Sequence, residues 1–430
     1  MRSMTLATVL VAISGYLILI VASHALGEAD YEIFLVYWGF FFALTGLLDG
    51  LMQETTRAVT ARRSTGESPL GEVSQEGVST AAAPRGAQPI RTAGLIALVL
   101  GVGTALLSPL FIGSMSPSSP VAGAAMLSIG LASYAFQALV CGLLSAAAEW
   151  NRFAALITID SVSRLILAVL AWAMGWHAVA FLLVTVLGAG TWVLFAAVSA
   201  PTRALFSELA DTDQGTFLQR TLKAMVASGA NAVIITGFPV LLKFTTDTSV
   251  PQGALAATIT AVTLTRAPIL VPLQRFQPAL IVHFTKARDR VLAAAALPLG
   301  IVGGLAIVGG VAAYFLGRPI LAVFFNEELL VAPLWLGLFT LVSGATAILM
   351  ITGSAALAAE RHSLYSVGWV IATIVAIGAL FLDAQPELRA LLALGIGPVV
   401  GAITHLGVLV FARRDSHATP PTEDKQHGLA

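Results

Sequence analysis

The chain has 430 residues, of which 57% are hydrophobic and only 11% are charged, and its mean hydropathy is +0.88. Soluble domains carry about 25% charged residues, so this chain lacks the polar surface that a water-soluble protein of its size needs. Its 23 basic and 23 acidic residues balance, which disfavours nucleic acid as a partner, and its single cysteine, Cys141, excludes an intrachain disulfide. These properties predict an integral membrane protein.

The apolar runs are long enough to cross a bilayer. A helix that spans the hydrocarbon core needs about 20 mainly apolar residues, whereas a barrel strand is shorter and alternates in polarity. Continuous runs bounded by charged residues or by Pro and Gly predict twelve transmembrane helices in an all-α protein. The predicted spans are 4–24, 33–52, 92–112, 121–148, 153–175, 178–199, 222–242, 253–283, 292–316, 330–354, 363–382 and 390–412.

The basic residues predict the orientation in the membrane. They gather in the loops on the side of the amino terminus, and the opposite loops contain only Lys243, Arg318 and Arg389. Both termini are therefore expected in the cytoplasm, and an even number of spans agrees with this.

The chain divides into two groups of six predicted helices. We expect an N-terminal lobe over 1–210, a C-terminal lobe over 211–414 and a disordered cytoplasmic tail over 415–430. The loop over 64–90 is rich in Ser, Gly, Ala and Pro, which is typical of a flexible linker. The tripeptide Ala-Ala-Glu closes the fourth span at 147–149 and the tenth at 358–360, as expected of an internal repeat whose halves share one orientation.

The informative residues are aspartates and arginines within the spans, where a charge costs about 2.5–3.5 kcal/mol on insertion scales. They are Asp49, Asp160, Arg164, Arg266 and Arg275. Facing lipid they would be costly, so the sequence predicts a water-filled central cavity lined by Arg164, Arg266 and Arg275. Arginine suits a phosphate or diphosphate group because its planar fork binds oxygen atoms in pairs.

Each of these charges also has a simpler interpretation. Asp160 and Arg164 are spaced i,i+4 and can neutralise one another on one helix face. Arg275 can extend to the inner interface, and Asp49 can be a helix-end charge instead of an ion-coupling site. Arg266 has no comparable alternative within its own helix.

The eighth predicted span is unusually long. It covers 253–283 and contains Pro268, Pro272 and Pro278, each of which removes a helix hydrogen bond. A bent helix that carries Arg266 and Arg275 is the best candidate for a moving, substrate-facing element. The alternative is a bend that serves only packing.

Three segments resemble a known family in their order and spacing. They are LGEADYEIFLVYWGFFFALTGLLDGLMQETTRAVTARR (26–63), CGLLSAAAEWNRFAALITIDSVSRLILAVLAWAMG (141–175) and LGRPILAVFFNEELLVAPLWLGLFTLVSGATAILMITGSAALAAERHSLY (316–365). With these segments the chain resembles the polysaccharide (lipid-linked oligosaccharide) flippases of the multidrug/oligosaccharidyl-lipid/polysaccharide (MOP) exporter superfamily, over nearly its whole length.

The resemblance implies two six-helix lobes that form a V, alternating access, and a location in the bacterial cytoplasmic membrane. It implies a polyprenyl-(di)phosphate-linked sugar or oligosaccharide as cargo, for cell-surface polysaccharide assembly. Membrane lipids and glycosyltransferases of the same pathway are the implied partners. Arg266, Arg275 and Arg164 would contact the cargo.

Two alternatives remain open at this point. A membrane-embedded lipid-dependent glycosyltransferase or polymerase would need acidic residues in sizeable outer loops, and the predicted outer loops are short, so we expect no enzyme. A drug:cation antiporter of the same superfamily would need membrane carboxylates, and only Asp49 and Asp160 are available. The histidines show no metal-ligand spacing, so no metal and no cofactor are expected apart from a coupling cation, Na⁺ or H⁺.

Overall fold

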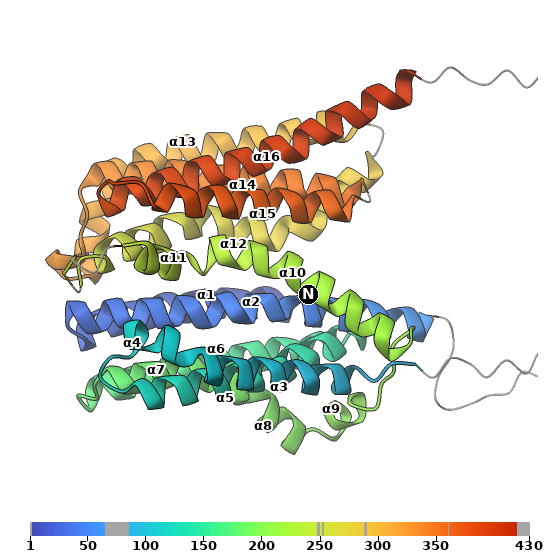
Figure 1. The fold of residues 1–430 in the computed structure, drawn as a ribbon, viewed down its shortest axis with the longest axis horizontal. Coiled ribbons are helices and arrows are strands. Elements are labelled where there is room, and N and C mark those ends of the chain that lie inside the picture. Colours follow the sequence, from blue (N-terminus) through green and yellow to red (C-terminus); the bar gives the residue numbers. More distant parts are fainter. Residues whose placement is uncertain are drawn as a thin grey trace, which may run out of the picture. The chain divides into compact units, whose positions relative to one another are not determined.

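The computed structural model describes residues 2–64, 86–246, 250–251, 253–287, 290–359 and 361–418. Within these ranges the chain is helical and has no strand, which confirms the all-α prediction (Figure 1). The elements are α1 (Arg2–Ala25), α2 (Glu28–Ser64), α3 (Pro89–Leu107), η1 (Ser108–Leu110), α4 (Ile112–Met115), α5 (Pro120–Ala146), α6 (Trp150–Ala173), α7 (Ala178–Leu187), η2 (Gly188–Gly190), α8 (Thr191–Val198), α9 (Ala200–Leu205), α10 (Gln214–Ile235), α11 (Phe238–Thr245), α12 (Ala256–Lys286), α13 (Val291–Phe324), η4 (Glu327–Leu329), α14 (Pro333–Ala358), α15 (His362–Leu380) and α16 (Pro386–Ala418).

Eleven of the described helices are long and apolar enough to cross a membrane, and the bent pair α10–α11 raises the number to twelve. The two members of that pair meet at 66°, with Pro239 in the first turn of α11. Proline has no backbone N–H and cannot continue the ladder of the preceding helix, so the predicted span 222–242 is broken at this point. The twelve-span prediction is confirmed when the bent pair α10–α11 is counted as one span.

Contacts between Cα atoms divide the chain into two compact units. We call Met1–Ala261 with Arg318–Ala332 the N-terminal unit, and Val262–Gly317 with Pro333–Ala430 the C-terminal unit. Helices α10 and α11 pack on α2 and therefore belong to the N-terminal unit by these contacts. The expected transport lobes over 1–210 and 211–414 stay a prediction.

The N-terminal unit is organised around α2, which packs on both α5 and α10. A side chain at Gly50 of α2 would place its Cβ 2.3 Å from the backbone nitrogen of Met225 in α10, so glycine permits this close approach. Leu48, Leu51 and Leu139 are fully buried in the same core. The approach of α2 and α10 is thus set by small residues at their crossing.

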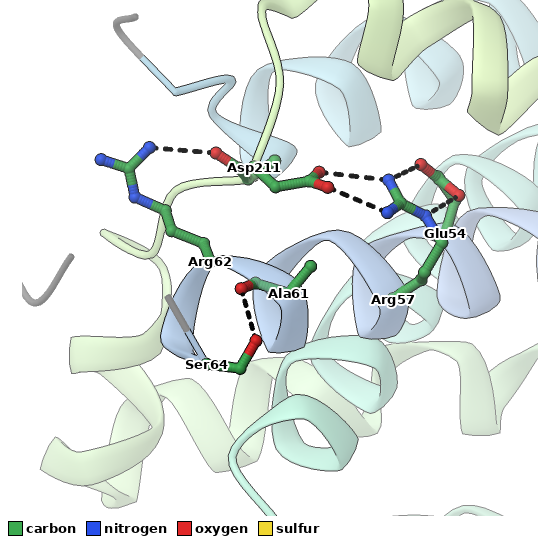
Figure 2. A network of polar contacts seen from close by, with 7 residues as sticks. Glu54, Arg57, Ala61, Arg62, Ser64 and Asp211 are labelled. Atoms are coloured by element: carbon green, nitrogen blue, oxygen red, sulfur yellow. Dashed lines mark hydrogen bonds and ion pairs between the residues drawn. The ribbon is translucent and has the colours of Figure 1, made fainter. Parts of the chain in front are cut away.

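Beyond the core, the last turns of α2 are bound to the chain segment before α10 (Figure 2). Arg57 donates to both carboxylate oxygens of Asp211, at 2.9 and 3.1 Å, and to both of Glu54, at 2.9 and 2.6 Å. Arg62 donates to the carbonyl of Ala210 at 3.1 Å. The backbone joins this network, since Ala210 N–H donates to the Ala87 carbonyl. We call these contacts the Arg57 network.

Helices α5 and α14 end in turns with hydrogen bonds of the same spacing. At the end of α5, the N–H of Ala147 donates to Leu143 and that of Glu149 to Leu144. At the end of α14, the N–H of Ala359 donates to Ala355 and that of Arg361 to Ala356. The bonds in α14 lie one residue later relative to the Ala-Ala-Glu tripeptide than those in α5, so the internal repeat stays a prediction.

Two predicted loop features fall partly outside the described residues. Of the linker predicted over 64–90, residues 65–85 lie outside them. Of the tail predicted over 415–430, the part up to Ala418 is helical because α16 continues to that residue, and residues 419–430 lie outside the description.

Candidate functional site

Asp160 and Arg164 form an ion pair inside the N-terminal unit. Both lie on α6, one turn apart, and Arg164 Nε donates to Asp160 Oδ1 at 2.6 Å. The Arg164 side chain is 3% exposed and that of Asp160 is 17% exposed. The guanidinium lies over the rings of Phe41 and Phe42, at 5.5 and 5.1 Å from their centroids. Cation–π contacts of this kind stabilise a desolvated arginine.

The ion pair lies against a break in the next transmembrane segment. That segment, 178–198, consists of α7 and α8 joined by the short 3-10 turn η2, whose sequence is Gly-Ala-Gly. Arg164 Nη1 donates to the carbonyl of Thr185 in α7. Interrupted helices are tolerated within a membrane where side chains satisfy the freed backbone groups, and Arg164 does so here.

Gln137 of α5 completes the cluster. Its Nε2 donates to Asp160 Oδ2 at 2.8 Å, so both oxygens of Asp160 accept a hydrogen bond. Arg164 Nη2 and Gln137 Oε1 are buried without a hydrogen-bond partner among the described residues. Buried polar atoms without partners are rare and mark functional or adaptable sites. We call Gln137, Asp160, Arg164 and the Thr185 carbonyl the α6 cluster.

Asp49 of α2 lies near this cluster. Asp49, Asp160 and Arg164 all interact electrostatically with the half-buried Tyr134 of α5. The Asp49 side chain is half-buried, and its carboxylate has no hydrogen-bond or ion-pair partner among the described residues. The α6 cluster and Asp49 together place two carboxylates and one guanidinium in the same polar region.

The remaining predicted arginines lie on α12. Arg266 is buried, with 4% of its surface exposed. Position 275 is part of the same helix, and its side chain lies outside the described part of the structure. Positions nine apart are about two and a half turns apart, so a regular helix directs them to opposite faces. Arg266 and Arg275 can therefore serve one cavity only if the helix bends between them, where Pro268 and Pro272 lie.

The sequence therefore identified some members of this site and missed others. Asp160, Arg164 and Asp49 were predicted. The structure shows Asp160 paired with Arg164, which is the simpler of the two interpretations given for these charges. Gln137, Thr185 and Gly188 were missed. The Gly-Ala-Gly sequence within a predicted span was the signal that could have indicated a break there. The described residues contain no group of three or more His, Cys, Asp or Glu side chains that could hold a metal ion.

The fold defines the class of the protein. Over 96% of both chains it superposes on an inward-facing multidrug resistance MATE family transporter of the MOP superfamily, with a TM-score of 0.72 and 14% identity. Over 97% of this chain and 96% of the other it matches a MOP superfamily transporter from Pyrococcus furiosus, with a TM-score of 0.66 and 12% identity. The chain is a multi-pass membrane protein with the fold of a MOP superfamily transporter.

The sequence relatives are mycobacterial. The chain is 37% identical over 409 residues to an uncharacterised protein of Mycobacterium tuberculosis, Rv3630, covering 95% of this chain and 91% of the relative. It is 36% identical over 408 residues to a second one, Rv1510, covering 95% and 90%. No family model matches the chain. The protein belongs to the same family as these two mycobacterial proteins.

Proposed function

We propose that the protein is a flippase. It carries a polyprenyl-(di)phosphate-linked sugar or oligosaccharide outwards across the cytoplasmic membrane, by alternating access, for cell-surface polysaccharide assembly. Glycosyltransferases that build this lipid-linked glycan supply the cargo. Both termini face the cytoplasm, as the distribution of basic residues indicates.

The observation that carries the proposal is the buried Arg266 in the first half of α12. An arginine at this depth costs several kcal/mol and persists where it has a task. A diphosphate group offers oxygen atoms that a guanidinium binds in pairs, and a polyprenyl chain can stay in the lipid while the headgroup crosses. Arg266 is the primary phosphate ligand, and Arg275 and Arg164 assist at other stages of the cycle.

Arg164 keeps its present partner in this role. In the present structure its Nε is bound by Asp160, whereas its Nη2 is still unpaired. An anionic headgroup could bind at Nη2 without breaking the ion pair. The membrane potential favours the direction proposed, because moving one negative charge outwards is worth about 2.3 kcal/mol per 100 mV.

A structural relative supports a departure from drug transport. The Pyrococcus furiosus transporter is described as having a binding pocket of reverse polarity that suggests a different function. An arginine-bearing cavity in this chain would likewise suit an anionic cargo better than a cationic drug.

The second candidate function is a drug:cation antiporter, and the α6 cluster favours it. Asp160 and Asp49 are carboxylates within the membrane, and a carboxylate that exchanges a proton or Na⁺ can drive export. This function would depend on Asp49 and Asp160, whereas a flippase would depend on Arg266.

The two functions are separated by one reconstitution. The purified protein is placed in vesicles with a fluorescent polyprenyl-diphosphate-linked sugar in both leaflets, and a membrane-impermeant quencher is added outside. A flippase exposes nearly all of the label, whereas vesicles without protein protect about half. Arg266→Ala should slow this exposure at least tenfold, since a hydrogen bond to a charged group contributes about 1.5–3 kcal/mol.

Arg152→Ala is the matched control, because Arg152 is a half-exposed arginine paired with Glu149 at 2.8 Å. Half of the label protected in the wild-type vesicles, or equal rates for the two variants, would reject the flippase. Export of a cationic dye that is lost in Asp160→Asn and retained in Arg266→Ala would identify the antiporter.

A further inference from the structure

The C-terminal unit contains a buried histidine that none of the predictions above uses. His405 lies on α16 and is completely buried. It lies about 10 Å inside the predicted cytoplasmic end of its span, since seven residues of helix separate it from residue 412. Its imidazole contacts Thr352 of α14 and Tyr365 of α15.

His405 interrupts a seam of small residues. On α16 the seam continues as Gly397 and Gly401, spaced four apart, and it faces Gly368 and Ala372 of α15. A Cβ at Gly401 would lie 2.6 Å from the Gly368 carbonyl, so the two helices touch closely there. A Cβ at Gly368 would lie 2.0 Å from His405 Nε2. Glycine at 368 therefore makes the space in which the imidazole fits.

Both ring nitrogens of His405 have oxygen partners. Nε2 lies 3.2 Å from the carbonyl of Tyr365 in α15, and a carbonyl can only accept, so Nε2 carries a hydrogen. Nδ1 lies 3.0 Å from the hydroxyl oxygen of Thr352 in α14. The ring also stacks on Tyr365 with an interplanar angle of 4°. The imidazole thus joins three helices of the unit.

The Thr352 hydroxyl has a single hydrogen and two possible acceptors. Its oxygen is 3.0 Å from His405 Nδ1 and 3.1 Å from the Leu349 carbonyl. When the hydroxyl donates to Nδ1, the imidazole is neutral. When it donates to Leu349, its oxygen can accept from a protonated Nδ1, and the ring is an imidazolium. The same positions of the heavy atoms satisfy both protonation states.

We propose that His405 is a proton-binding site of the C-terminal unit, with the Thr352 hydroxyl as its adjustable partner. The proton adds at Nδ1, and the Thr352 hydroxyl turns from donor to acceptor by pointing its hydrogen at Leu349. Neither His405 nor Thr352 is one of the carboxylates of the α6 cluster or one of the proposed cargo ligands, so the inference does not rest on the flippase.

The charges around His405 decide what a bound proton does. Helix α14 has no ionisable side chain, and α15 has only His362 and Tyr365. Those on α16 are Glu387, Arg389, Arg413, Arg414, Asp415 and His417, and all of them are eight or more positions from His405. No acidic residue of these three helices therefore neutralises an imidazolium in the seam. Proton uptake favours a state in which α15 and α16 separate enough for water to reach the ring.

The test is a titration of His405 in lipid bilayers. Thr404–His405 is the only Thr–His pair among the seven histidines, so carbonyl-¹³C threonine with ¹⁵N histidine identifies its signal in the unaltered protein. We expect the ring to change from the neutral form protonated at Nε2 to the imidazolium between about pH 5 and 8. A ring that stays neutral over this range would overturn the proposal.

Variants of Thr352 test its adjustable role. Thr352→Val removes the acceptor for a protonated Nδ1, so the midpoint should move to lower pH by about one unit. Thr352→Ser keeps the hydroxyl and should keep the midpoint. Thr346→Val is the control, because Thr346 is buried on the same helix and its hydroxyl does not bond to His405. An unchanged midpoint in Thr352→Val, or an equal change in Thr346→Val, would refute the role assigned to Thr352.

Discussion

Gly188 lies directly against Asp160. A Cβ placed on Gly188 would be 1.5 Å from Asp160 Oδ1, and 2.3 Å from Arg164 Nε. The turn that breaks the sixth transmembrane segment therefore places the backbone of a glycine in contact with the ion pair. Any side chain at position 188 would displace the Asp160 carboxylate, which accepts two hydrogen bonds.

Gly188→Ala should consequently disrupt the α6 cluster. Overpacking of a well-packed interior costs about 1–3 kcal/mol, and here it also separates a buried ion pair. We expect a lower free energy of unfolding in mixed micelles. Gly190→Ala, two residues on, is the control, because nothing lies within 4 Å of a Cβ there. Equal stability of the two variants would show that the cluster accommodates a side chain at 188.

Removing one charge of the pair should cost more than removing both. Asp160→Asn leaves the buried Arg164 without a counter-charge, and breaking a buried pair in this way costs about 3–5 kcal/mol. Asp160→Asn combined with Arg164→Gln should recover part of this loss in the same unfolding assay. Glu149→Gln, which breaks the more exposed pair with Arg152, should change stability by less than about 1 kcal/mol. A double variant less stable than Asp160→Asn would reject the pairing.

The opposite end of the N-terminal unit is held by Glu32. Its carboxylate is 2% exposed, accepts from Lys243 Nζ at 2.5 Å, and accepts from the backbone N–H groups of Gly253 and Leu255 at 2.8 and 3.1 Å. Glu32→Gln should lower the free energy of unfolding towards the lower end of about 3–5 kcal/mol, because Lys243 keeps some contact with solvent.

Glu327→Gln is the control for Glu32, since Glu327 pairs with Arg318 while 76% of its side chain is exposed. This variant should be near neutral. Hydrogen exchange gives a second measurement, with faster exchange expected at Gly253 and Leu255 in Glu32→Gln. Unchanged exchange at these two amides would mean that Glu32 does not hold the start of α12.

The Arg57 network should restrain the segment before α10. Arg57→Ala removes four hydrogen bonds to Glu54 and Asp211, so the amides of Ala210 and Asp211 should exchange at least about fivefold faster. Arg152→Ala should leave both amides unchanged. Exchange in Arg57→Ala at the wild-type rate would show that the backbone bonds alone hold this segment.

The membrane location, the number of spans and the identity of the charged residues within them follow from the sequence alone. They are local properties, because about 20 apolar residues in a row specify a spanning helix whatever its neighbours are. The i,i+4 spacing of Asp160 and Arg164 is equally local, and for this reason their pairing was among the interpretations that the sequence offered.

Only the tertiary structure decided which groups from different helices meet. Gln137, the Thr185 carbonyl and Gly188 reach the Asp160–Arg164 pair from positions 21 to 28 residues away, and His405 meets Thr352 across 53 positions. No periodicity in a single helix encodes such meetings. They depend on how closely two helices approach. Glycines permit the close approach, since the backbone at Gly188 contacts the Asp160 side chain and the backbone at Gly368 contacts the His405 side chain.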